Sequence, residues 1–213
     1  MYYVCHVIIY KPNIFDMETT LKTTPINTAI PADARIFVTD YASYNEGTQF
    51  EFGQWVDLAH FKSAEDLTQN ILDHFSYCDT VRPLACGTPR EEIMITDFEG
   101  FPAAFYDECM DFEPLFEYFE RASSCGYDLE IVEAFTKLGN YKVEDVDKFF
   151  DALEESYSGQ YDSDEDFACE TAEECGQIQD NLQWPYTCID WKQAAHELMF
   201  DHYEQDGHYF RAC

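Results

Sequence analysis

The sequence predicts an α+β fold, with strands in the first half of the chain and helices in the second. Two observations carry this prediction. Around Ile36 and Val38 the side chains alternate with the period of a strand, and beyond Gly100 the apolar residues follow the period of a helix. Apolar residues make up 46% of the 213 residues and aromatic residues 17%, so the chain can bury a core. This length suits one or two ordinary domains or three small ones.

Residues 1–33 form an N-terminal extension whose composition differs from that of the rest. They hold a β-like run from Tyr2 to Tyr10, then a stretch rich in Thr, Asn and Pro, and only three acidic residues, Asp16, Glu18 and Asp33. We interpret them as an appended arm, with the β-like run as a candidate extra strand.

The segment that begins at Ala34 is predicted to form a small unit of three strands and one helix. Ser63, followed three residues later by Asp66, resembles a capping box and predicts a helix that carries Leu67, Ile71 and Phe75. The expected strands are 35–39, 52–58 and 92–97, with a turn at 45–47 and a loop at 82–89.

Beyond Gly100 the pattern predicts a series of helices. In one of them Val146, Phe149, Phe150, Leu153 and Tyr157 share one side, while acidic residues occupy the opposite half. Five helices are expected. The first carries the apolar face of Phe112, Leu115, Phe116 and Phe119, and the second runs from an Asp128 cap to Gly139. The other three span 143–157, 163–175 and 191–203.

The chain is strongly acidic, with a formal net charge of −31 at pH 7. Between Glu91 and Glu174, 26 Asp and Glu residues stand against four Lys and Arg residues, a net charge of −22. Such a run is ordinarily disordered, but this one contains the apolar faces of the predicted helices, so we expect a folded core under an anionic surface. The acids then serve solubility and salt tolerance, or they imitate a polyanion for a partner.

The second interpretation gives a candidate partner-binding surface. Duplex DNA carries one charge per ~1.7 Å of axis, so a charge of −31 corresponds to about 15 base pairs and a symmetric dimer to about 30. The predicted surface consists of Glu113, Glu117, Glu120, Glu130, Glu133, Glu144, Asp145, Asp147, Asp151, Glu154, Glu155, Asp162, Asp164, Glu165, Asp166, Glu170, Glu173 and Glu174.

A calcium loop is a weaker alternative for part of this set. The positions of an EF-hand loop match Asp162, Asp164, Asp166, Glu170 and Glu173. Phe167, however, stands where the sharp turn of that loop needs Gly. We therefore favour the start of an acidic helix.

Other catalytic or metal-binding patterns are weak. His196, His202 and His208 are spaced by six and do not share a helical face. Among the nine cysteines, Cys169 and Cys175 come closest to a pair of zinc ligands, but we interpret the cysteines as buried apolar residues. Hydrolase, phosphate-binding and dinucleotide motifs are absent, so we expect no enzyme activity, no metal and no cofactor. No run reaches the ~18 to 20 apolar residues of a membrane span, so we expect a cytoplasmic protein without a membrane partner.

Short motifs follow one another in a fixed order along residues 34–211. They include Arg35-Ile36-Phe37-Val38, Gly53-Gln54-Trp55, Asp97-Phe98-Glu99-Gly100, Gly159-Gln160-Tyr161-Asp162-Ser163, Cys188-Ile189-Asp190-Trp191 and Gly207-His208-Tyr209-Phe210-Arg211. No single motif is decisive, but the ordered set resembles the ArdA antirestriction proteins.

The resemblance implies an elongated dimer that mimics bent B-form DNA and occupies the DNA site of Type I restriction–modification enzymes. The partner is then the DNA-binding subunits of such an enzyme, and nucleic acid itself is not a partner. The alternative is an acidic interaction module that binds another basic, DNA-binding protein. The resemblance also implies three small domains after the 1–33 extension: an α+β domain at 34–105, a helical domain at 106–146 and a mixed α/β acidic domain at 147–213.

We place the expected homodimer contact in the closing segment, because that segment is aromatic and less acidic than the block before it. Its aromatic residues are Trp184, Tyr186, Trp191, Phe200, Tyr203, Tyr209 and Phe210.

Overall fold

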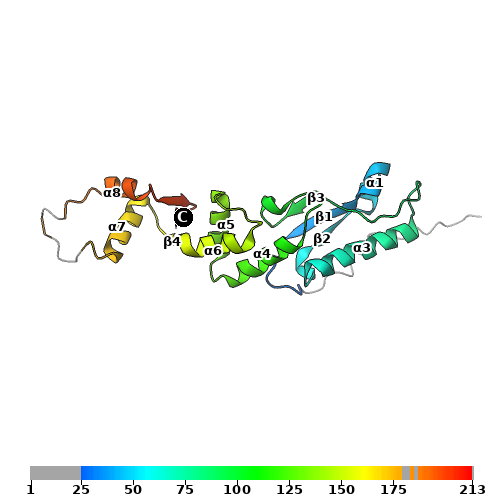
Figure 1. The fold of residues 1–213 in the computed structure, drawn as a ribbon, viewed down its shortest axis with the longest axis horizontal. Helices are drawn as coiled ribbons and strands as arrows, with labels where there is room; N and C mark the ends of the chain where they lie inside the picture. Colours follow the sequence, from blue (N-terminus) through cyan, green and yellow to red (C-terminus); the bar gives the residue numbers. More distant parts are fainter. Residues whose placement is uncertain (1–24, 179–182, 185–186, 213) are drawn as a thin grey trace, which may run out of the picture.

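The computed structural model describes residues 25–178, 183–184 and 187–212. In these ranges the chain forms an elongated body with a three-stranded antiparallel sheet toward each end and helices between the two sheets (Figure 1). This arrangement confirms the predicted α+β class. Within the described ranges, no helix combines the length and the apolar character needed to cross a bilayer.

The first sheet has the order β2-β1-β3. Its strands are β1 (Arg35–Asp40), β2 (Gln54–Asp57) and β3 (Ile93–Glu99), which confirms the three predicted strands. Ile36 pairs with Val56 on one side and with Phe98 on the other, and a bulge follows at Phe37/Val38 in the pairing with β3. Ile36 and Val38 are buried, as the alternation predicted.

The connection from β1 to β2 is helical, so the prediction of a simple turn at 45–47 is wrong. Two short helices, α1 (Tyr41–Glu46) and α2 (Gln49–Phe52), fill it. The Asp40 carboxylate accepts a hydrogen bond from the Ser43 backbone N–H at 2.7 Å and caps α1. Gly47, with φ of 74°, ends that helix in the left-handed region.

The third helix, α3 (Ala64–Val81), follows a short 3₁₀ turn at Leu58–His60 and begins where the capping pattern predicted. Ser63 Oγ accepts a hydrogen bond from the Asp66 N–H at 3.2 Å, and the Asp66 carboxylate accepts one from the Lys62 N–H. The predicted loop at 82–89 is confirmed and ends at the buried Arg90.

The middle of the molecule is helical. It contains a 3₁₀ turn at Ala103–Phe105 and the helices α4 (Glu113–Ser124), α5 (Leu129–Leu138) and α6 (Val146–Ser156). Asp128 occupies the N-cap position of α5 without a side-chain capping bond, and Gly139 ends the helix with φ of 68°. The predicted helix 143–157 was too long at both ends. The helix begins only at Val146, and Tyr157 leaves it and begins a strand.

The second sheet was not predicted. It has the order β4-β6-β5, from β4 (Tyr157–Gln160), β5 (His202–Gln205) and β6 (His208–Arg211). Helices α7 (Asp164–Glu174) and α8 (Trp191–Leu198) pack together beside it. The last helix therefore ends earlier than the predicted 191–203. Its predicted last turn is part of a hairpin, in which Asp206 and Gly207 both have positive φ.

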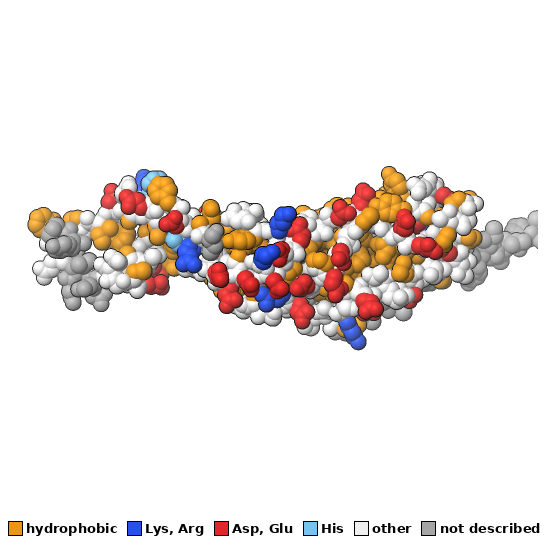
Figure 2. Space-filling model, in the orientation of Figure 1, with side chains coloured by type: hydrophobic (Ala, Val, Ile, Leu, Met, Phe, Trp, Pro, Cys, Tyr) orange, Lys and Arg blue, Asp and Glu red, His pale blue; other side chains and the backbone are white. Residues whose placement is uncertain are grey.

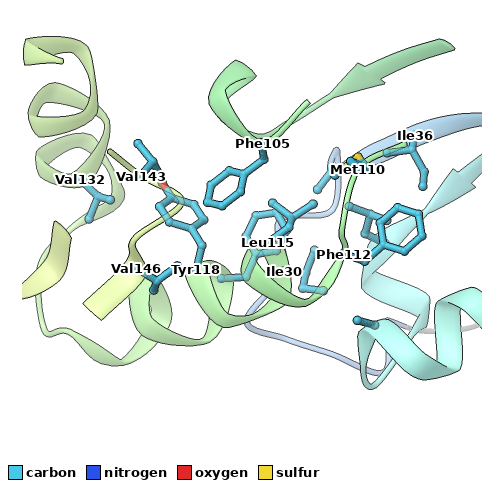
Figure 3. Close-up of a cluster of buried hydrophobic side chains, with 14 of the residues drawn as sticks. Ile30, Ile36, Phe105, Met110, Phe112, Leu115, Tyr118, Val132, Val143 and Val146 are labelled. Carbon is cyan, nitrogen blue, oxygen red and sulfur yellow. The ribbon is translucent and has the colours of Figure 1, made fainter. Parts of the chain in front are cut away.

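One hydrophobic core runs from Ile30 to Phe210 through both sheets and the helices between them. Figure 3 shows Ile30 pointing toward Leu115 and Phe112 in this cluster. The Ile26 and Asn27 N–H groups donate to the Ala59 carbonyl at 3.0 and 3.1 Å, so residues 25–33 join the first sheet unit. The β-like run from Tyr2 to Tyr10 lies outside the described residues. The boundaries at 105/106 and 146/147 stay a prediction.

Candidate functional site: an anionic surface

All eighteen acids of the predicted surface are exposed. Their helices bury the opposite face: α4 buries Leu115, Tyr118 and Phe119, and α6 buries Phe149 and Leu153 among others. Amphipathic packing thus fixes which side of each helix points to water, and the carboxylates follow from it.

The same acidic spacing occurs on three helices. Carboxylates stand at i, i+4 and i+7 on each of them, and side chains with this spacing lie on one face, about 5 to 6 Å apart between neighbouring Cβ atoms. The triplets are Glu113, Glu117 and Glu120 on α4, Asp147, Asp151 and Glu154 on α6, and Asp166, Glu170 and Glu173 on α7.

The first turn of α7 holds three consecutive acids, Asp164, Glu165 and Asp166. Ser163 caps the helix by accepting a hydrogen bond from the Asp166 N–H at 3.2 Å, and the helix dipole favours negative charge at this end. The residues considered for a calcium loop therefore form a capped helix start. Among the described residues, no group of three or more His, Cys, Asp or Glu side chains is arranged to hold a metal ion.

Burial and, second to it, the negative charges around α7 raise the pKa values of two neighbouring groups. Burial, followed by the charges of Glu174 and Glu170, raises the pKa of Tyr161. Burial, followed by the charge of Glu173, raises the pKa of the Cys169 thiol. Both shifts favour the neutral form of the neighbouring group, as an anionic environment requires.

Two of the predicted acids are paired within the chain. Asp145 pairs with Lys148 and raises the pKa of that amine, and Asp151 lies 3.5 Å from the Arg121 guanidinium. Further ion pairs within the described ranges join Arg35 to Glu99, Arg82 to Glu51, Arg90 to Asp40 and Asp79, and Lys137 to Asp206. Most described cations are thus bound to acids of their own chain, and the remaining carboxylates of the predicted surface face the solvent.

The structure adds acids that the prediction missed. Figure 2 shows Asp and Glu side chains along the full length of one face, from the α7–α8 end to the α1–α3 end. The additional exposed acids include Glu65, Asp66 and Asp73 on α3 and Asp107, Glu108 and Asp111 before α4. The high number of acidic residues in the sequence could have indicated these additional acids. Only the packing of α3 against α4, however, joins them to the predicted surface.

The histidines do not form a site. His208 is buried, with Nδ1 3.2 Å from the Tyr157 hydroxyl, and His202 Nδ1 lies 3.0 Å from the Leu198 carbonyl oxygen. His196 is exposed and its ring contacts Phe200.

The prediction of buried cysteines holds for Cys78 and is wrong for four others. Cys86, Cys109, Cys175 and Cys188 are exposed. All seven cysteines of the described residues are free thiols.

The aromatic closing segment divides into two parts. Tyr209 and Phe210 are buried in the chain's own core and are unavailable to a partner, which corrects their place in the expected dimer contact. Trp184, Phe200 and Tyr203 are exposed by 80%, 73% and 44%, and Trp191 is half-buried. Tyr186 lies outside the described residues.

Comparison with known proteins identifies the family. No curated protein matches the chain. The family model described as "Antirestriction protein (ArdA)" matches residues 36–210, which cover both sheets and all the acidic helices. The chain therefore belongs to the ArdA family of antirestriction proteins, a family of inhibitors that act on restriction enzymes rather than a family of enzymes.

Proposed function

We propose that the chain blocks Type I restriction–modification enzymes by presenting carboxylates where those enzymes bind DNA phosphates. The observation that carries this proposal is the repeated i, i+4, i+7 spacing of exposed acids on α4, α6 and α7. The Lys and Arg residues that an enzyme directs at a DNA backbone recognise negative charge, and they supply most of the sequence-independent affinity for DNA. A folded surface with regularly spaced carboxylates competes for the same residues.

The elongated shape supports this proposal (Figure 1). A compact protein with the same charge would present only a short track to an extended DNA-binding groove. Here acids follow the long axis of the body, and most described cations are paired internally. The net charge of −31 corresponds to about 15 base pairs of duplex.

A homodimer is part of the proposal, because the charge of one chain corresponds to a shorter duplex than the one that an enzyme with a split recognition site contacts. The exposed Trp184, Phe200 and Tyr203 are the candidates for the contact, since interfaces are enriched in exposed aromatic residues. Sedimentation equilibrium at micromolar concentration is expected to give twice 24.9 kDa, and a 24.9 kDa species would overturn the dimer.

The decisive test is displacement of DNA from a purified Type I enzyme. A labelled duplex carrying the recognition site is bound to the enzyme, and the chain is added at increasing concentration. Displacement at a fixed stoichiometry supports mimicry. If excess chain leaves the duplex bound, and the same chain binds a different basic DNA-binding protein, the acidic surface serves a general interaction module instead.

A further inference from the structure

One cavity combines the acidic surface with an apolar floor. It has a volume of about 450 Å³ and lies between α3, β3 and the segment that leads into α4. We refer to it as the α3–β3 groove. Its volume falls within the range of small-molecule binding pockets.

The floor of the groove follows from an alternating sequence. Met110 and Phe112 are buried, whereas Asp111 and Glu113 between and after them are exposed. The Ile95 N–H donates to the Glu108 carbonyl at 2.9 Å, which holds this segment beside β3. Figure 3 shows Met110 and Phe112 directed into the core near Ile36. Asp111 and Glu113 are exposed, so the segment turns apolar side chains inward and acids outward.

The rim of the groove is anionic. Glu65 comes from α3, and Glu108, Asp111 and Glu113 come from the facing segment, all of them exposed. No Lys, Arg or His is among the described residues that line the groove. Glu113 also belongs to the acidic triplet of α4, so the groove is continuous with the anionic surface.

A second cavity shows why this combination matters. It has a volume of about 480 Å³ and is lined by Glu117, Glu144, Asp145 and Asp147, but also by Lys142, and its one apolar side chain is Val146. Lys142 reduces the negative charge of this second cavity, and the cavity has no apolar floor. An incoming cation would find little there beyond what the open surface gives.

We propose that the α3–β3 groove receives an arginine side chain of the DNA-binding partner. This inference rests on the proposed function and adds a specific anchor to it. An arginine carries an aliphatic stem and a planar guanidinium with five N–H donors, so it can cover the apolar floor while donating to carboxylates from two sides. The more strongly hydrated ammonium of lysine fits a partly apolar groove less well. A DNA backbone has no counterpart of this floor, so the groove gives the inhibitor a contact that the substrate lacks.

The first test separates groove shape from charge. Gln69 is exposed and lines the groove on α3, and Asn70 is exposed on the same helix but does not line it. Gln69→Trp fills the groove without changing the net charge, and Asn70→Trp is the matched control. In the DNA-displacement assay, Gln69→Trp is expected to weaken inhibition about tenfold and Asn70→Trp less than about twofold. Equal inhibition by both variants would overturn the anchor and leave charge mimicry intact.

The second test separates these acids from other acids. Glu65→Gln combined with Glu108→Gln removes two charges from the rim, and Glu91→Gln combined with Glu92→Gln removes two exposed charges outside it. The rim pair is expected to weaken inhibition several-fold more than the control pair. Equal losses would mean that charge acts without the groove.

A third measurement tests directly whether the groove binds an arginine side chain. It needs no enzyme, so its result holds even if the chain fails to displace DNA. The protein is labelled with [methyl-¹³C]methionine and titrated with Nα-acetyl-arginine amide. A saturable shift is expected at Met110 in the groove floor and not at Met199 at the end of α8. Nα-acetyl-norleucine amide is expected to give no such shift, and Gln69→Trp is expected to remove it. Absence of a shift at Met110, or an equal shift with the uncharged compound, would overturn the proposal.

Discussion

Tyr209 donates its hydroxyl hydrogen bond to the Asp164 carboxylate at 2.7 Å. The bond joins β6, near the C-terminal end of the chain, to the first turn of α7. Burial and this acceptor raise the pKa of Tyr209, which keeps the hydroxyl protonated as a donor. Asp164 therefore has two roles: it belongs to the anionic surface, and it fixes the acidic helix to the second sheet.

Removal of this hydrogen bond should lower the free energy of unfolding while changing the inhibitory concentration little. Tyr209→Phe is expected to reduce the free energy of unfolding by about 1 to 2 kcal/mol, because a buried ring loses a hydrogen bond to a charged group. Asp164→Asn keeps an acceptor oxygen and should change stability less. Urea unfolding of the two variants checks this order, and a larger loss in Asp164→Asn would contradict it.

Gly100 ends the Asp97-Phe98-Glu99-Gly100 motif and directly follows β3, and its backbone allows no side chain. Its φ is +77°, and a Cβ there would lie 2.6 Å from the backbone of Ala34. Gly100→Ala is expected to destabilise the fold by roughly 3 kcal/mol or more, because the clash involves backbone rather than a movable side chain. Gly126 is a matched control, because its φ is +81° and a Cβ there would meet no atom within 4 Å. Gly126→Ala should cost about 1 kcal/mol in thermal or urea unfolding, and equal losses would show that the Ala34 contact is unimportant.

Inhibition should depend on many carboxylates away from the α3–β3 groove. Glu117→Gln alone is expected to change the inhibitory concentration less than about fivefold, because single exposed charge contacts contribute ~0 to 1 kcal/mol. Neutralising Glu117 and Glu120 on α4 together with Glu154, Glu170 and Glu173 should weaken binding strongly and flatten its salt dependence. A single such substitution that abolishes inhibition, with an unchanged circular dichroism spectrum, would contradict distributed mimicry.

Salt should act in opposite directions on stability and on binding. The carboxylates of the free chain repel one another, so the melting temperature is expected to rise as ions screen them over a Debye length of about 8 to 10 Å. Affinity for a basic partner should fall over the same range, since salt screens the attraction. Both are measured from about 50 to about 500 mM salt. A parallel rise would indicate that apolar contacts dominate binding.

Stability should fall at alkaline pH through buried groups. Burial raises the pKa of the Cys78 thiol from 9.0 to about 11 and that of Tyr118 from 10.0 to about 12. The unfolded chain releases the Cys78 proton at lower pH than the folded chain, so stability is complete below pH 9 and is lost as pH rises toward 11. The loss from Cys78 is expected to reach roughly 2 to 3 kcal/mol.

The variant Cys78→Ala tests the assignment. It should flatten the decline in unfolding free energy between about pH 9 and about pH 11, whatever its effect at neutral pH. The same slope in the variant and in the parent chain would assign the decline to other groups, such as Tyr118.

Local patterns in the sequence were sufficient for the elements that local chemistry determines. Ser63 and Ser163 cap their helices as predicted, and Gly139 ends α5. The amphipathic period placed Leu115 and Phe119 of α4 and Phe149, Phe150 and Leu153 of α6 inside, and therefore placed the acids outside, although it missed the buried Tyr118. The helix capped by Asp40 was missed because its cap lies inside the end of a strand.

The family motifs turn out to mark the fold more than the surface. Gly100 adjoins Ala34, Gly207 forms the turn between β5 and β6, and Tyr209 and Phe210 are buried. The acids of α4 and α6 lie between these motifs rather than in them. A resemblance based on the motifs thus identifies the family, while the charge pattern identifies the candidate surface.

The sequence by itself determined the fold class, most helices and the exposure of the acids, because each depends on neighbours within a few residues along the chain. Only the tertiary structure decided the second sheet, in which Tyr157 pairs with Phe210, and the burial of Arg90 against Asp79. It also decided the α3–β3 groove, whose walls come from three separate segments. These features require contacts between residues far apart in the chain, and local periodicity contains no term for such contacts.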